Sequence, residues 1–172
     1  GYSTYSEQVT PEALVDVLNQ YLSLGAQAIL AEEGTLDKFM GDAVMAFWNA
    51  PELQADHAVR AVRAAWHMHT LVRQHQQAAP ASARLQFGVG LHVGDAVVGN
   101  IGAERALNYT AIGDAVNLAK RLQEGAAGNQ IVLSDAIYQA VRAHVEAVEL
   151  EAVQVKGRVA LEKRWELRNV LD

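Results

Sequence analysis

Cysteine is absent from this chain of 172 residues, so it can form no disulfide, no thiolate metal site and no cysteine nucleophile. No apolar run approaches the roughly 20 residues that span a bilayer. The first residues lack a basic segment followed by an apolar one, so we predict no signal peptide. Basic residues are the minority, with 14 Lys and Arg against 20 Asp and Glu, and this balance disfavours nucleic acid as a partner.

Hydrophobic residues make up 51% of the chain and charged residues 20%. This composition is typical of a globular protein, and the length suits a single domain with its own core. The sequence opens at Gly1 without an initiator Met. We therefore expect one domain over residues 1–172, incomplete at its N-terminus and part of a longer chain.

Turn and cap residues delimit the first predicted elements. Thr10 followed by Pro11 marks the start of a helix, and Gly34 ends it. Residues 35–48 are rich in apolar and β-branched side chains, and a Gly-Asp turn at residues 41–42 divides them. This pattern predicts two strands around a tight turn.

The middle of the chain repeats this arrangement. Asp56 is the expected cap of a second helix, and a Gly-Asp turn at residues 94–95 predicts a hairpin of residues 85–91 with residues 96–101. Asp114 is the expected cap of a later helix. The other predicted strands and helices are short and lie at residues 109–112, 115–123, 131–133, 134–143, 153–155 and 165–167.

The order helix–hairpin–helix–hairpin lacks only a leading strand to become the βαββαβ unit of ferredoxin-like folds. We therefore predict an α+β fold with a ferredoxin-like, palm-like core and C-terminal additions. Its helices should pack on one face of a mixed, mostly antiparallel sheet. The leading strand would lie before Gly1, outside the sequence given.

Asp42 lies at the tip of the first predicted hairpin, directly after Gly41. A carboxylate held at such a turn is a good ligand for Mg²⁺, which takes one or two carboxylates together with substrate phosphates. The alternative is a turn aspartate that bonds only to its own backbone.

Asn117 and Arg121 are four residues apart on one predicted helix, so both side chains point the same way. An amide beside a guanidinium can orient a sugar and stabilise charge on a phosphoryl group during its transfer. The alternative is a solvated polar stripe.

Five motifs occur in order along the chain: Lys-Phe-Met-Gly-Asp at residues 38–42, Gly-Leu-His-Val-Gly at 90–94, Gly-Asn-Ile-Gly at 99–102, the segment at 109–121, and Val-Lys-Gly at 155–157. Taken together, they resemble the catalytic domain of class III nucleotidyl cyclases, the bacterial adenylate and guanylate cyclases. The resemblance extends from Gly1 to about residue 167.

The resemblance implies a role for each matching residue. Asp42 matches the second of two metal-binding aspartates, and the first would lie three residues before Gly1. Lys38 and Thr110 match the base-reading pair of adenylate cyclases, whereas guanylate cyclases typically carry Glu and then Cys or another small residue. Lys38 also disfavours guanylate cyclase activity, because lysine cannot accept guanine's ring N–H.

The same resemblance assigns further residues to the ribose and the phosphates of the nucleotide. Asn117 matches the residue that orients the ribose, Arg121 the one that stabilises the transition state, and Lys156 a lysine on the terminal phosphates. The end of the family's phosphate-binding turn falls at Gly1, Tyr2 and Ser3.

The implied reaction converts ATP to 3′,5′-cyclic AMP and pyrophosphate, by in-line attack of the ribose 3′-oxygen with two Mg²⁺ or Mn²⁺ ions. In this family the metal aspartates come from one chain and the other site residues from its partner, so a homodimer is expected. We expect a cytoplasmic signalling domain, free or attached to membrane or sensor segments upstream. Some family members with Thr at the position of Thr110 respond to bicarbonate.

Two alternatives stay open at this point. A non-catalytic cyclase-like module could serve in dimerisation or regulation, and an Ala or Asn in place of the upstream aspartate would favour it. Guanylate cyclase activity is the other alternative. The Gly-Gly-Asp/Glu-Glu-Phe signature of diguanylate cyclases is absent.

Overall fold

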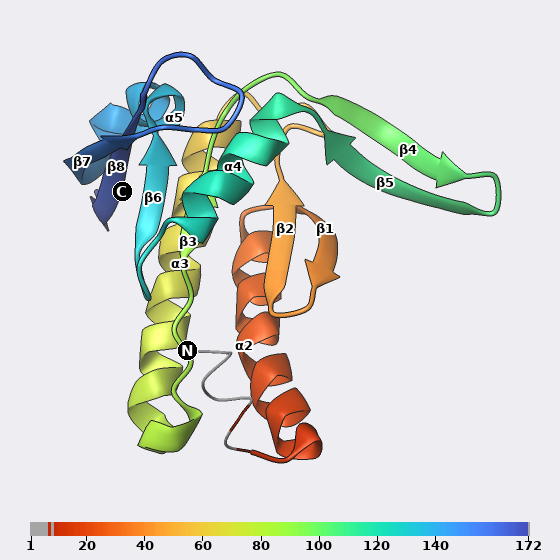
Figure 1. The fold of residues 1–172 in the computed structure, drawn as a ribbon, viewed down its shortest axis with the longest axis vertical. Coiled ribbons are helices and arrows are strands. Elements are labelled where there is room, and N and C mark those ends of the chain that lie inside the picture. Colours follow the sequence, from red (N-terminus) through yellow and green to blue (C-terminus); the bar gives the residue numbers. More distant parts are fainter. Residues whose placement is uncertain (1–6, 8, 172) are drawn as a thin grey trace.

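The structure is a computed structural model that describes Glu7 and residues 9–171 (Figure 1). Its helices are α2 (Pro11–Ala31), α3 (His57–Ala78), α4 (Asp114–Glu124) and α5 (Asp135–Val141), with 3-10 turns η1 (Ala81–Ala83) and η2 (Arg142–His144). Its strands are β1 (Thr35–Met40), β2 (Ala43–Phe47), β3 (Val89–Leu91), β4 (Val97–Ala103), β5 (Ala106–Ile112), β6 (Ile131–Ser134), β7 (Val145–Val153) and β8 (Glu162–Val170). None of the described helices has the length and apolar character needed to cross a membrane.

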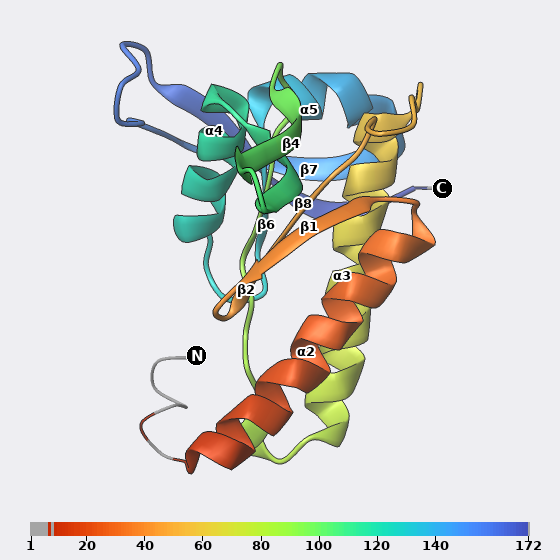
Figure 2. The same ribbon diagram turned by 90° about the vertical axis from the view of Figure 1, so that its right-hand side faces the viewer.

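The first helix begins where the sequence predicts. The Thr10 hydroxyl accepts a hydrogen bond from the Ala13 backbone N–H at 3.2 Å, and Pro11 is the first helical residue. Tyr21, only 1% exposed, connects α2 to the segment that leads into β3. Its hydroxyl donates to the Ala83 carbonyl at 2.9 Å and accepts from the Leu85 backbone N–H at 3.1 Å. Tyr21 also packs in one cluster with Val72 of α3, and helices α2 and α3 lie side by side as one layer (Figures 1 and 2).

The described strands form one four-stranded sheet and two hairpins. In the four-stranded sheet, β3 pairs in parallel with β6, β6 pairs antiparallel with β8, and β8 antiparallel with β7. The hairpins β1–β2 and β4–β5 are both antiparallel, and β4–β5 projects from the body of the molecule (Figure 1). The α+β class and the mixed, mostly antiparallel sheet are thus confirmed, and α2-β1-β2-α3-β3 follows the βαββαβ order from its first helix onward.

The predicted hairpin of residues 85–91 with residues 96–101 is wrong. β3 pairs with β6, and β4 pairs instead with β5, from Val97 opposite Ile112 to Ala103 opposite Ala106. The turn of this hairpin is therefore at residues 104–105, which carry no turn glycine, and the Gly-Asp pair at 94–95 belongs to a connecting segment. The apolar alternation of residues 85–91 reflects burial against helices and not pairing with the next strand.

Three smaller predictions also need correction. The helix-capping position before α4 is Gly113, and Asp114 is the first helical residue. Asp56 does occupy the position before α3, but its side chain makes no capping hydrogen bond and accepts from Arg60 Nε at 2.7 Å instead. The two late strands are longer than expected, and β7 ends where the predicted strand at residues 153–155 begins.

Helices cover both faces of the four-stranded sheet, not one face as expected. All four residues of β6 are buried, and alternate side chains along a strand point to opposite faces. Ile131 and Leu133 pack in a core with residues of α3 and α5, whereas Val132 packs with Leu118 and Leu122 of α4. The strand is therefore enclosed between two helical layers.

Helix α4 lies so close to β3 that only a glycine fits at position 90. A Cβ atom on Gly90 would come within 2.3 Å of the Ala119 carbonyl oxygen and 2.4 Å of the Gln123 backbone nitrogen. Because both of these atoms belong to the backbone of α4, a side chain at this position would have to displace the helix.

We predict that Gly90→Ala lowers the free energy of unfolding by about 1–3 kcal/mol, because the added methyl group overpacks the contact between β3 and α4. Chemical denaturation of both proteins measures this difference. Gly99→Ala is the matched control, since a Cβ there meets no atom of the described residues within 4 Å. Equal destabilisation of the two variants would contradict the assigned contact.

Candidate functional site

The predicted site residues fall into two groups on the structure. Asn117, Arg121 and Lys156 line one pocket, and Lys38 and Thr110 lie near each other on β1 and β5. Asp42 lies at the turn between β1 and β2. The proposed phosphate-turn residues Gly1, Tyr2 and Ser3 lie outside the described residues.

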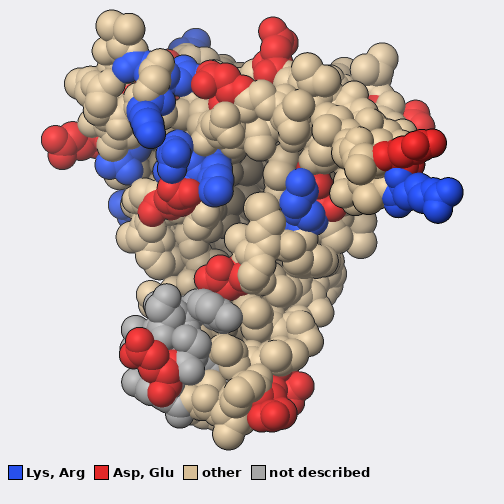
Figure 3. All heavy atoms as spheres, turned by 45° about the vertical axis from the view of Figure 1, so that its right-hand side comes forward, with Lys and Arg blue, Asp and Glu red and all other residues tan. Residues whose placement is uncertain are grey.

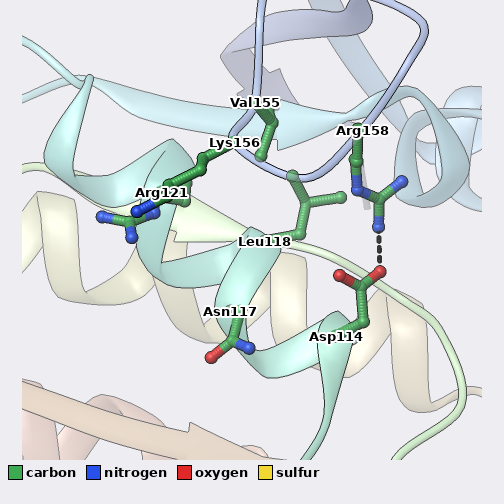
Figure 4. A pocket seen from close by; sticks show the side chains of 7 residues that line it. All are labelled: Asp114, Asn117, Leu118, Arg121, Val155, Lys156 and Arg158. Atoms are coloured by element: carbon green, nitrogen blue, oxygen red, sulfur yellow. Dashed lines mark hydrogen bonds and ion pairs between the residues drawn. The ribbon is translucent and has the colours of Figure 1, made fainter.

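The pocket has a volume of about 220 Å³ and lies between α4 and the loop that joins β7 to β8. Asn117 and Arg121 project from successive turns of α4, and Lys156 reaches from the loop on the same side as Arg121 (Figure 4). The complete lining is Asp114, Asn117, Leu118, Arg121, Val155, Lys156 and Arg158. The structure thus brings together the three residues predicted to hold the ribose and the phosphates.

Positive charge predominates in this pocket, although the whole chain is acidic. Its lining holds the basic side chains of Arg121, Lys156 and Arg158 and only one carboxylate, that of Asp114. Basic side chains gather beside a hollow in the upper half of the molecule, where α4 and the β7–β8 loop lie (Figure 3). An anionic ligand would be attracted to this site and not to the surface in general.

Among the described residues, Arg121 pairs only with Glu124, and this pair is weak. Its guanidinium is 3.1 Å from the Glu124 carboxylate, one turn along α4, and both side chains are about half exposed, at 52% and 43%. An exposed pair of this kind contributes little to stability. The guanidinium can therefore exchange Glu124 for a phosphate without loss of fold.

Arg158 connects the β7–β8 loop to the first turn of α4. Its guanidinium donates to the Asp114 carboxylate, as the dashed line in Figure 4 shows, and to the Glu162 carboxylate at 2.5 Å. The sequence patterns did not single out Arg158, because the three residues of this network are far apart in the chain or lie in an irregular loop. The network holds the loop that carries Lys156 over α4.

Lys38 and Thr110 both contact Asp37, a residue that the sequence patterns also did not single out. The Thr110 hydroxyl donates to Asp37 Oδ2 at 2.5 Å, and Lys38 Nζ lies 3.6 Å from Asp37 Oδ1. The side chain of Asp37 is 1% exposed, whereas that of Lys38 is 44% exposed. The available signal was the carboxylate of Asp37 directly beside Lys38 in a predicted strand, because adjacent opposite charges can form an ion pair.

Asp42 is exposed, and Gly41 before it has the positive φ, 60°, that a tight turn requires. The described residues contain no group of three or more His, Cys, Asp or Glu that could hold a metal ion. One exposed carboxylate satisfies only part of what Mg²⁺ needs, with substrate phosphates or further carboxylates supplying the rest. Asp42 therefore fits as one ligand of a metal–nucleotide complex and not as a metal site by itself.

Among the described residues, the second group does not line the pocket that holds Asn117 and Arg121. Lys38, Thr110 and Asp42 are all missing from the lining of the pocket on α4. The connection between the groups is covalent, since β5 carries Thr110 and leads through Gly113 directly into α4.

Comparisons with known proteins show which family the chain resembles. The family model described as "Adenylate and Guanylate cyclase catalytic domain" matches residues 1–168. Adenylate cyclase 1 of Rhizobium meliloti is 36% identical over 161 residues, which are 91% of this chain and 24% of that protein. Adenylate cyclase of Anabaena cylindrica is 34% identical over 124 residues, 72% of this chain and 25% of that protein. The chain therefore spans about a quarter of these curated relatives.

Solved structures give the same result for the fold. The adenylyl cyclase CyaB from P. aeruginosa is 32% identical with a TM-score of 0.89, and the match covers 98% of this chain and 89% of that one. The guanylyl cyclase Cya2 is 34% identical with a TM-score of 0.92, and the match covers 99% and 87%. The similar structures thus include both an adenylyl and a guanylyl cyclase.

We predict that Arg158→Ala increases amide hydrogen exchange in residues 154–161 while the four-stranded sheet keeps its protection, because only the attachment of the loop to α4 is lost. Exchange followed by mass spectrometry measures this effect. Lys163→Ala is the matched control, since it removes only an exposed ion pair with Glu149 at 3.7 Å. Unchanged exchange in the loop of the Arg158→Ala variant would show that Arg158 does not hold it.

Proposed function

The chain belongs to the family of adenylate and guanylate cyclase catalytic domains, and on this premise we propose that it is an adenylate cyclase. It would convert ATP to 3′,5′-cyclic AMP and pyrophosphate. The observation that carries this proposal is the pairing of Lys38 with Thr110 around Asp37.

The chemistry of that pair is complementary to adenine. A lysine ammonium only donates hydrogen bonds, and adenine's ring N1 only accepts them, whereas guanine carries a hydrogen on N1. The Thr110 oxygen can accept from the 6-amino group of adenine, while guanine has a carbonyl there. The names of the curated relatives point to adenylate cyclases as well. The resemblance to a guanylyl cyclase structure makes guanylate cyclase activity the alternative.

The pocket on α4 supplies the remaining groups for the reaction. Asn117 would orient the ribose so that its 3′-oxygen faces the α-phosphate in line with the leaving pyrophosphate. Arg121 would stabilise the charge that develops on the α-phosphate, and Lys156 would neutralise the terminal phosphates. Two divalent cations, Mg²⁺ or Mn²⁺, would lower the pKa of the 3′-hydroxyl and neutralise the leaving group, with Asp42 as the described carboxylate that would hold them.

We propose a homodimer as the active form. Asp42 does not line the pocket that holds Asn117 and Arg121, so a second copy would complete the site. A projecting two-stranded hairpin is only marginally stable in water, and β4–β5 exposes Val97 at 65% and Leu107 at 52%. Further large apolar side chains, Phe39 and Met40 on β1 and Val98 and Ile112 on the hairpin, are also exposed. A partner copy would bury these surfaces.

We also propose that the intact protein is longer and places this domain on the cytoplasmic side, where ATP is available. Among the described residues, β2 pairs only with β1, and β3 pairs only with β6. The leading strand of the βαββαβ unit would fit between β2 and β3 and would bring the first metal aspartate with it. Sensor or membrane segments would occupy further parts of the chain, since the matched segment is only 24% and 25% of the two curated relatives.

We predict that protein expressed from its complete coding sequence forms cyclic AMP from ATP with Mn²⁺, and much less cyclic GMP from GTP. Product formation should rise faster than linearly with enzyme concentration in the range where dimers assemble. Chromatographic quantification of both cyclic nucleotides over a dilution series tests this. Cyclic GMP as the main product would establish the alternative activity, and no product from a folded protein would establish a non-catalytic module.

The shared site allows complementation between inactive variants. We predict that Asp42→Ala and Arg121→Ala are each inactive alone, because every site in either homodimer lacks one essential group. Mixed after dissociation, they should recover about a quarter of the wild-type activity, because half of the dimers are mixed and each holds one intact site of two. Recovery would be absent if both residues acted within one chain.

A further inference from the structure

Asp37 presents a buried carboxylate whose surroundings do not satisfy it. Its side chain is 1% exposed, and among the described residues Oδ1 has no hydrogen-bond partner. Oδ2 accepts the hydroxyl hydrogen of Thr110 at 2.5 Å, and Lys38 Nζ lies 3.6 Å from Oδ1. A buried carboxylate without full compensation is destabilising, so the fold does not gain stability from this residue as it would from an apolar one.

The backbone directs Asp37 inward by an irregularity in the hairpin. Leu36 is opposite Ala46 and Lys38 is opposite Met45, so Asp37 is the extra residue of a β-bulge with no partner on β2. Bulges change the direction of a side chain relative to the regular strand. This bulge allows the carboxylate to reach Thr110 on β5 while Lys38 remains half exposed.

The hydrogen bond from Thr110 fixes the polarity of its hydroxyl group. A threonine hydroxyl has one hydrogen to donate and two lone pairs that accept. Because the hydrogen is donated to Asp37, only lone pairs are left for any other partner. Thr110 is itself 4% exposed, so its hydroxyl has little freedom to rotate away from this carboxylate.

We propose that Asp37 determines purine specificity as a positioning residue, by holding Thr110 as a hydrogen-bond acceptor and by orienting the Lys38 ammonium. This inference rests on the proposed function and deepens it. Adenine offers a 6-amino donor to the Thr110 oxygen. Guanine offers a 6-oxo acceptor, which would face lone pairs and stay unpaired, and an unpaired buried polar group discriminates strongly. Asp37 does not touch the base in this scheme and acts only through Thr110 and Lys38.

The test compares Asp37→Asn, Thr110→Val and the double variant with the wild type, using protein expressed from its complete coding sequence. Asparagine keeps the size of the side chain but can donate to the Thr110 oxygen, which releases the hydroxyl hydrogen for guanine. Valine keeps the shape of threonine without its hydroxyl. Asp16→Asn, at an exposed position on α2, is the control. The measured quantity is the ratio of kcat/KM for ATP to kcat/KM for GTP.

We expect Asp37→Asn to lower this ratio by about tenfold or more, with a higher KM for ATP, because the partner of a charge-assisted hydrogen bond is changed. In the Thr110→Val background the same change should alter the ratio far less, since the hydroxyl through which Asp37 acts is gone. Equal losses with both nucleotides, and an unchanged ratio, would assign Asp37 a structural role only and overturn the proposal. The proposal would also be overturned if Asp37→Asn changed the ratio by the same factor with and without Thr110→Val.

Binding measurements separate this proposal from the proposed function. Calorimetry with adenosine and guanosine 5′-(α,β-methylene)triphosphates, which cannot release pyrophosphate, gives the purine preference without turnover. A wild type that makes no cyclic product would refute the proposed activity, yet a preference for the adenosine analogue that Asp37→Asn reduces would support the role of Asp37. Equal relative affinities in wild type and variant would overturn that role even in an active enzyme.

Discussion

Backbone contact between α4 and β3 sets the position of the residues proposed to handle ribose and phosphate. At Gly90 the two backbones are so close that a Cβ would lie 2.3 Å from the Ala119 carbonyl oxygen. On the same side of α4, Leu118 and Leu122 are buried against Val132 of β6. The flank of the helix beside these leucines therefore presents Asn117 and Arg121 from a rigid support, and Leu118 lines the same pocket. Rigidity matters here because an error of about 1 Å in the placement of reacting groups costs about a hundredfold in rate.

The polar interactions of the site differ in how firmly they are fixed. Asp37 and Thr110 form a buried pair with little access to water, whereas Arg121 and Glu124 form an exposed pair that a ligand can replace. The groups proposed to choose the base are thus held in place without a nucleotide. The guanidinium proposed to meet the phosphates can change partners, which would suit charge that moves during a reaction.

Much of the architecture could be predicted from local sequence signals. The Thr10-Pro11 start of α2, the turn at residues 41–42 and the buried strand β6 follow from rules that involve only neighbouring residues. The pairing of β4 could not be predicted in this way. A Gly-Asp pair indicates a turn wherever it occurs, but it does not show which strand β4 will pair with. β4 pairs with β5, and the turn between them at residues 104–105 has no glycine to indicate it.

The sequence by itself determined the family, the α+β class and the motif residues, because all of these are properties of short segments and of their order. Only the tertiary structure decided that Asn117, Arg121 and Lys156 line one pocket, since the loop after β7 returns over α4. It also decided that Asp37, separated from Thr110 by 73 positions, accepts its hydroxyl hydrogen. Contacts over such sequence separations depend on how the strands and helices pack, and no local pattern encodes that packing.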